Sequence, residues 1–398
     1  MKKKNVVRFL YAILLSGAAL ILFVKFLVNP LLQYCNTPEN WSSLKQLPAD
    51  YYNAEQREFA SLVTSLLREK SGIVPGSQEV ALDAQDLKRL SAIRTDPESL
   101  ARLFSGGHDI YPNRFSNSFK LEEGSADSLT SFWSRYRQFV RSITAVARES
   151  LNQGDTVEGF GYLRKNLVLG LAISKGMGGD LNLLHPLLGT AILKQDFYIP
   201  MLSFIEKNPV QAISSAPEIL DLIALEDSQH VDCAAAISGE ENCGLRIISV
   251  LKKKFPLQIW FLELALNRGK NSENMYKNYM DGAILTVNTP SGRLSGYYEE
   301  QKKKMPSMSP IGLIIPSMAN LDVKFLELDA LRGLTRSALT GKASEDPFDS
   351  AQPLKAKADG DNVILYSIGK DGIDDQGRGD LSLKTPDIAI KIPARLWK

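Results

Sequence analysis

Apolar residues recur every three or four positions through most of this chain, from about Ala49 to Leu339. This spacing is typical of amphipathic α-helices that pack on one face. The most regular stripe consists of Leu129, Phe132, Trp133, Tyr136, Val140, Ile143 and Ala147. We found no fixed repeat period in this region, and few runs alternate with period two. We therefore expect a mainly α fold in which residues 49–340 form an irregular helical bundle or array.

Capping residues predict where one of these helices begins and ends. Asp155 precedes an apolar run and Glu158 follows three positions later, which is the pattern of a capping box. The glycine-rich run 176–179 predicts that this helix ends near Lys175.

The pattern changes after Gly341, where the helical period gives way to alternation. The segments 354–358, 363–366 and 388–392 have the composition or period of β-strands, and Asp359-Gly360 is a hairpin-type turn between the first two. We expect residues 341–398 to form a small β-meander of about three strands.

The N-terminal segment has the pattern of a membrane anchor. Three lysines at 2–4 precede an uncharged apolar run from Phe9 to Val24. Residues 6–28 would form a helix of about 34 Å at 1.5 Å per residue, enough to cross a bilayer core of about 30 Å. Arg8 and Lys25 lie near its two edges, where long basic side chains reach the headgroups. This predicts one transmembrane helix that contacts the lipid bilayer.

Cleavage of this segment is the alternative interpretation, because a signal peptide also has a basic start and an apolar core. No small-x-small site follows residue 28, and Tyr34 stands where a small residue should precede a lipidated Cys35. The excess of basic residues before the span predicts a cytoplasmic tip at 1–5, followed after the span by a linker at 29–48. The bulk of the chain would then be periplasmic or extracellular, at the inner membrane of a bacterium.

The composition argues against some partners and some kinds of metal site. The chain has 398 residues, with Lys+Arg 47 and Asp+Glu 45, so its net charge is +2 and we expect no nucleic-acid partner. Three cysteines and three histidines disfavour four-thiolate and multi-histidine metal sites.

Basic tripeptides occur at 252–254 and 302–304. They could contact anionic lipid or an anionic polymer. Alternatively, they are solvated helix ends, where lysines suit the negative pole of the helix dipole.

Cys233 and Cys243 flank a short polar segment, and we expect a disulfide between them outside the cytoplasm. Two alternatives stay open. Both thiols could be buried and unpaired, or they could join His230 and an acidic neighbour, Asp232 or Glu226, around a metal.

Candidate acid–base groups are few. His108 is followed by Asp109, which could orient it as a general base, and His230 is a second candidate. No nucleophile elbow, zinc-binding helix motif or phosphate-binding glycine loop accompanies them. The sequence therefore identifies no enzyme class.

An acidic, glycine-rich loop lies between the last two predicted strands. Asp371, Asp374 and Asp375 fall within five residues, and such loops gather oxygen ligands around calcium or form a solvated turn. The order of residues is not that of an EF-hand.

This loop also carries a resemblance. The string Leu365-Tyr366-Ser367-x-Gly369-x-Asp371-Gly372, with Asp346-Pro347-Phe348, Asp374-Asp375 and Asp387-Ile388, resembles the C-terminal end of the major pseudopilin of type II secretion. It is similar also to the same module in uncharacterised membrane-anchored bacterial proteins. The resemblance covers about 50 residues and implies calcium, with these ligands: Leu365, Ser367, Asp371 and Asp374 or Asp375.

The start of the chain departs from the pseudopilin pattern. Lys4-Asn5-Val6-Val7 precedes the apolar span, without the Gly-containing processing site or the Glu five residues beyond it. The rest of the chain carries no resemblance. A shared module does not transfer a function.

We therefore expect a membrane-anchored binding or scaffolding protein of the bacterial envelope, with another envelope protein as its partner. Two alternatives remain. The chain could be a component associated with a secretion or pilus-like machine, through its terminal module, or a periplasmic enzyme of an unrecognised family.

Overall fold

The computed structural model describes residues 53–69, 82, 84–104, 126–175, 183–265, 271–289, 293–304, 318, 320–385 and 387–397. The predicted cytoplasmic tip (1–5), transmembrane helix (6–28) and linker (29–48) lie outside these residues, as do His108 and Asp109. None of the described helices is both long enough and apolar enough to span a bilayer.

The described chain is mainly helical, as the sequence predicts. The first helices in chain order are α4 (Ala54–Glu69), α5 (Ala84–Leu90), α6 (Pro97–Phe104), α7 (Ala126–Asn152), α8 (Thr156–Ser174), α9 (Leu184–Ile192), α10 (Ile199–Lys207), α11 (Pro209–Ser214) and α12 (Ala216–Gln229). A π-helical segment, η3 (Leu193–Tyr198), joins α9 to α10 without a break. The later helices are α13 (Cys233–Lys254), α14 (Pro256–Ala265), α15 (Ser272–Val287), α16 (Leu294–Lys304) and α17 (Leu321–Thr340).

The predicted helix start at Asp155 is confirmed. The Asp155 carboxylate accepts a hydrogen bond from the backbone N–H of Glu158 at 3.0 Å and so caps α8, which ends at Ser174 as expected. Glu158 does not complete the predicted capping box in the expected way. Its carboxylate accepts a hydrogen bond from the Ser150 hydroxyl on α7, so it ties two successive helices together.

The C-terminal sheet confirms the predicted meander. Strands β3 (Lys355–Asp359), β4 (Asn362–Ser367) and β5 (Ile388–Pro393) form an antiparallel sheet in that order. Gly360 adopts a φ of +62° in the turn between β3 and β4, a conformation that glycine tolerates. A further pair, β1 (Glu345–Asp346) and β2 (Asp349–Pro353), was not predicted, and a short 3₁₀ turn, η4 (Ala394–Leu396), follows β5.

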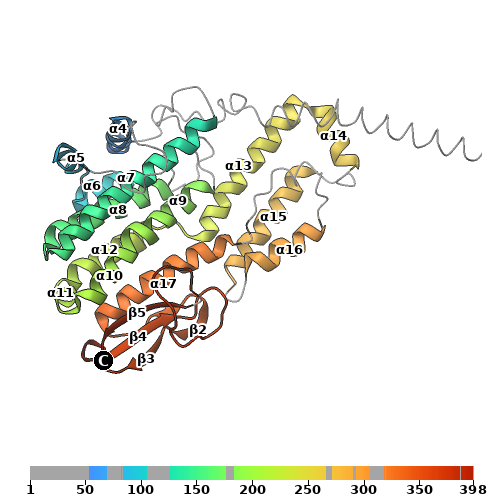
Figure 1. The fold of residues 1–398 in the computed structure, drawn as a ribbon. Coiled ribbons are helices and arrows are strands. Elements are labelled where there is room, and N and C mark those ends of the chain that lie inside the picture. The colour runs from blue at the N-terminus through green and yellow to red at the C-terminus, as the bar shows by residue number, and fades with distance from the viewer. Residues whose placement is uncertain are drawn as a thin grey trace, which may run out of the picture.

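Helix α17 belongs to both hydrophobic cores of the described chain. Its first half contributes Leu321 and Phe325 to a core with α13, α15 and α16. Its second half contributes Leu331 and Leu334 to the larger core, which extends from α4 through α12 into the apolar faces of β4 and β5. Figure 1 shows α17 lying between the layered helices and the sheet. The C-terminal strands are therefore packed onto the helical part through α17 and α10.

The close crossing of α8 and α9 generates a first prediction. A methyl group at Gly189 would lie 2.6 Å from the carbonyl oxygen of Gly170 and would also overlap the Ser174 hydroxyl. We expect Gly189→Ala to destabilise the protein by about 1–3 kcal/mol, because the two backbones must separate. Denaturant unfolding measures the difference.

Gly161, on α8, provides the matched control. A methyl group there meets nothing within 4 Å, so Gly161→Ala should stabilise the helix by about 0.5–1 kcal/mol. Equal stabilities for the two variants would contradict the tight crossing.

Candidate functional site

The π-helical segment η3 has a local cause in Pro200. A proline has no backbone N–H, so the carbonyl of Asp196, four residues earlier, lacks its usual helical donor. The side-chain amide of Asn166 on α8 donates a hydrogen bond to this carbonyl at 3.0 Å. The helix thereby continues past Pro200 with a wider turn.

Three polar side chains of η3 are buried, and each bonds to a different helix. Lys194 forms an ion pair with Glu327 of α17 at 2.6 Å. Tyr198 donates a hydrogen bond to Glu226 of α12 at 3.0 Å. The third, Asp196, faces α7. Because buried polar groups must find partners, these bonds fix how the helices can pack around η3.

Asp196 lies in a largely apolar interior. It accepts a hydrogen bond from the Thr144 hydroxyl at 3.0 Å. Burial raises the pKa of Asp196 to about 6, and the hydrogen bond from Thr144 and the charges of Arg141 and Arg137 only partly oppose this shift. Such a shift is typical of functional carboxylates but also of buried structural ones.

A second buried polar cluster joins α12 to α17 through Glu226 and Arg332. Glu226 is fully buried, and its two carboxylate oxygens accept from Arg332 Nε and, at 2.6 Å, from Nη2. Arg332 also donates to Asp329 at 2.7 Å. Burial opposes the charge of Arg332, but its pairing with Glu226 outweighs this and raises the pKa of the guanidinium.

His230, a candidate acid–base group, lies at the end of α12 in this second cluster. Its Nδ1 is 3.2 Å from Arg332 Nη2. Since arginine has no acceptor, this contact makes Nδ1 the acceptor and leaves the proton on Nε2. His230 is therefore held by Arg332, while the other candidates, His108 and Asp109, lie outside the described residues.

The predicted disulfide between Cys233 and Cys243 is contradicted. Both residues lie on α13, and Cys233 is a free, buried thiol. Ten residues of helix separate their backbones by about 15 Å, whereas a disulfide requires Cα atoms within about 7 Å. The polar segment between them, which suggested a loop, is helical. Burial raises the pKa of the Cys233 thiol, which makes it unreactive.

In the acidic loop after β4, two of the predicted calcium ligands, Asp374 and Asp371, accept hydrogen bonds from the protein itself. Asp374 accepts hydrogen bonds from Lys355 Nζ at 2.8 Å, from the Tyr366 hydroxyl and from the Gln376 backbone. Asp371 is exposed, and its carboxylate accepts from the backbone N–H of Ile373 in a turn. In the described part of the chain, no three His, Cys, Asp or Glu side chains form a metal-binding group.

The other residues of the resemblance support the fold of the module. The Ser367 hydroxyl donates to the buried Asp346 carboxylate at 2.7 Å. Asp346 also accepts from the backbone of Ile368 at 3.0 Å, so it ties β1 to the end of β4. Leu365 is fully buried in the central strand, paired with Ala356 on one side and Ile390 on the other.

Asp387, just before β5, is part of the resemblance but was not among the predicted calcium ligands. Its side chain is fully buried, Oδ2 accepts from Gly377 at 2.8 Å, and Oδ1 has no hydrogen-bond partner among the described residues. Burial raises the pKa of Asp387, and the charges of Asp375 and Asp374 raise it further, against backbone donors that lower it. A buried carboxylate oxygen without a donor is costly unless a proton or cation accompanies it.

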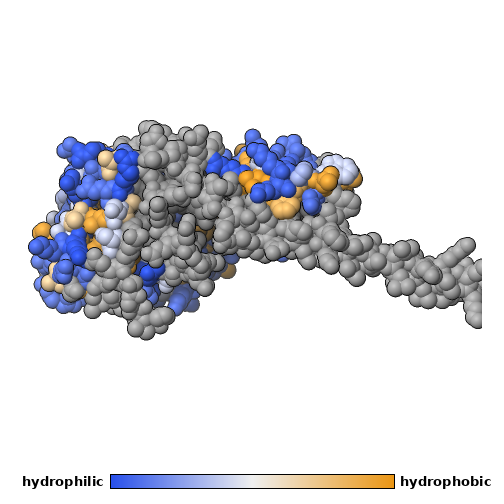
Figure 2. All heavy atoms as spheres, turned by 90° about the horizontal axis from the view of Figure 1, so that it is seen from above, coloured by the Kyte–Doolittle hydropathy of each residue, from blue (hydrophilic) through white to orange (hydrophobic). Residues whose placement is uncertain are grey.

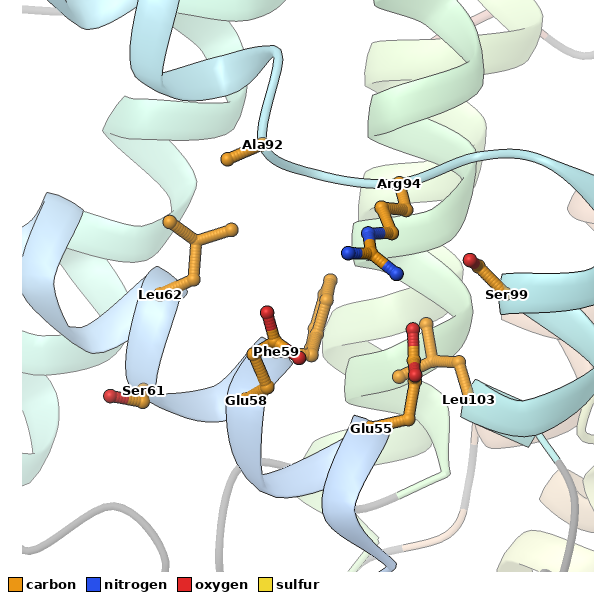
Figure 3. A pocket seen from close by; sticks show the side chains of 9 residues that line it. All are labelled: Glu55, Glu58, Phe59, Ser61, Leu62, Ala92, Arg94, Ser99 and Leu103. Atoms are coloured by element: carbon orange, nitrogen blue, oxygen red, sulfur yellow. The ribbon is translucent and has the colours of Figure 1, made fainter.

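A surface pocket lies between α4 and α6, with a volume of about 330 Å³. Figure 3 shows Arg94 reaching into it toward Phe59, with the carboxylates of Glu55 and Glu58 on either side. Leu62 and Leu103 complete its apolar wall. The pocket therefore offers both charges and an apolar surface, which suits an amphipathic ligand.

The Glu226–Arg332 pair generates a second prediction. Removing one partner of a buried ion pair leaves the other charge uncompensated, so Glu226→Gln and Arg332→Met should each lower the free energy of unfolding by about 3–5 kcal/mol. The double variant should lose less than the sum. Urea unfolding of the three variants tests this.

Glu300→Gln is the control, because Glu300 and Lys304 form an exposed pair with 62% and 59% of their side chains accessible. Because water screens this exposed pair, the substitution should change the free energy of unfolding little. If Glu226→Gln were no more destabilising than Glu300→Gln, the buried pair would not support the packing of α12 on α17.

Comparisons with family models, with curated proteins and with solved structures give no match to this chain.

Proposed function

We propose that this protein is a membrane-anchored, extracytoplasmic binding or scaffolding protein of the bacterial envelope. The observation that carries the proposal is the uncharged run from Phe9 to Val24 behind a basic tip. In this proposal residues 6–28 stay in the inner membrane, residues 1–5 remain in the cytoplasm, and the helical array and its sheet lie outside.

The described surface supports a binding role. The pocket between α4 and α6 lies on the first described helix after the anchor and linker, and Arg94, Glu58 and Phe59 give it an amphipathic lining. A segment of another envelope protein with apolar and charged side chains would suit it better than a small neutral molecule. Two hydrophobic cores joined by α17 would hold this surface at a fixed position relative to the membrane.

Membrane extraction tests the anchor. We expect the full chain to stay in the membrane pellet after alkaline carbonate treatment, and protease added to spheroplasts to digest its bulk. Leu15→Arg places a charge in the middle of the span and should release the protein or reduce its insertion, because a charged residue there costs about 2.5–3.5 kcal/mol. Leu15→Ala is the control and should stay in the membrane.

Two results would overturn this topology. One is a mature chain that lacks residues 6–28. The other is a helical array and sheet that protease cannot digest in spheroplasts but can digest after lysis.

We also propose that the C-terminal module takes up a calcium ion next to Asp387. The supporting observation is the buried Asp387 Oδ1 without a donor among the described residues, close enough to Asp375 and Asp374 for their charges to act on it. Calcium prefers such carboxylate oxygens and would supply the positive charge that this oxygen lacks. Asp374, in contrast, already forms an ion pair with Lys355.

Thermal unfolding tests the calcium proposal. A ligand that binds only the folded state at about 100 times its Kd stabilises the protein by about 2.7 kcal/mol, so calcium should raise the Tm. Asp387→Asn should abolish the increase, and Asp361→Asn, at an exposed position in the same module, should keep it.

The Asp371→Asn variant separates the two ligand sets. Loss of the calcium effect in that variant would favour the ligands that the resemblance implies over Asp387. An unchanged Tm of the natural sequence in calcium would contradict both.

A further inference from the structure

Helix α14 has an apolar face that the described residues leave exposed. Leu257, Trp260 and Leu264 are 75%, 60% and 53% exposed, and their spacing of three and four places them on one stripe of the helix. Figure 2 shows hydrophobic residues at the end of the molecule where α14 lies, beside hydrophilic ones. Exposed apolar residues grouped in this way mark a contact surface more often than isolated ones do.

The opposite face of α14 is fixed to the protein. Ile259 is buried, with 2% exposed. Glu263 accepts a hydrogen bond from the backbone N–H of Ser272 at 2.8 Å and forms an ion pair with Lys252 of α13 at 3.1 Å. The helix is therefore held on α13 in one orientation, and its exposed stripe is a consequence of that orientation.

Exposed lysines directly precede this stripe in the chain. Glu263 is the only acidic residue of α14, and it is turned inward to Lys252. The last turn of α13, directly before α14, ends in Lys253 and Lys254, which are both exposed. An apolar stripe with a tryptophan and neighbouring lysines matches the composition of helices that lie in the interface of anionic membranes.

We propose that α14 docks on the surface of an anionic lipid bilayer, with Leu257, Trp260 and Leu264 in the interface and Lys253 and Lys254 on the lipid headgroups. This inference rests on the proposed function, because an anchor at residues 6–28 would keep the rest of the chain near the bilayer. Tethering raises the local lipid concentration, so that a short stripe and two lysines suffice for contact. The anchor and α14 together would limit how the helical array is oriented on the membrane.

Quenching of Trp260 by brominated lipid tests the docking. The full chain is reconstituted in vesicles of phosphatidylcholine brominated on its acyl chains, with or without one quarter phosphatidylglycerol. The chain has four tryptophans, so the emission of Trp260 is the difference between the natural sequence and Trp260→Phe. We expect at least half of this emission to be quenched in the anionic vesicles and clearly less in the neutral ones. Lys253→Gln with Lys254→Gln should reduce the quenching in anionic vesicles to the neutral level.

A tryptophan at the other end of the molecule is the matched control. Val210 on α11 is 64% exposed, and Figure 1 shows α11 at the end opposite α14. Val210→Trp in the Trp260→Phe background should stay unquenched. Quenching at both positions would overturn the proposal, because it would indicate general insertion of an unfolded chain.

The remaining outcomes separate α14 from the anchor. A chain that floats with the vesicles but shows no quenching at Trp260 overturns the docking and leaves the anchor in place. Quenching at Trp260 in a chain that carbonate extracts supports the docking and overturns the anchor. A chain that does not associate with either vesicle overturns both. A blue shift of Trp260 emission that depends on protein concentration, without quenching, would assign the stripe to a second copy and overturn the lipid proposal.

Discussion

The packing of α17 is the constraint on which the rest of the described structure depends. Its two halves lie in different hydrophobic cores, and its outer surface supports the C-terminal strands. It also carries one partner of two buried ion pairs, Glu327 for Lys194 and Arg332 for Glu226. A helix in this position cannot shift along its axis without breaking both pairs and both cores at once.

The buried ion pairs bear on specificity more than on stability. Moving charges out of water is unfavourable, and well-packed apolar residues often do as well or better. In this protein the ion pairs fix where the helices lie relative to one another. Lys194 extends from η3 to α17 and Tyr198 extends from η3 to α12, so the two contacts fix the position of η3 relative to both helices. The wider turn caused by Pro200 therefore contributes to the specificity with which these helices pack.

Local patterns in the sequence were sufficient to predict the helices, strands and turns. They were insufficient to predict the contacts between them. The helical period, the cap at Asp155 and the turn at Asp359-Gly360 act within a few residues, and all three were predicted. Glu226 and Arg332 are 106 residues apart, so no spacing rule could pair them. The prediction of a disulfide was wrong because it, too, ignored tertiary packing. A polar segment around Gly239 suggested a loop, but packing against α15 keeps it helical.

Hydrogen exchange measured by mass spectrometry on the full chain with Leu331→Ala tests the role of α17 most directly. Leu331 is fully buried and belongs to the larger core, not to the core that α17 forms with α13, α15 and α16. If α17 joins the two cores into one cooperative unit, exchange should accelerate in α8, in β4 and β5, and to a similar degree in α13 and α15. Acceleration confined to α8 and the strands, with α13 and α15 unchanged, would show that the two cores unfold independently and would contradict this account.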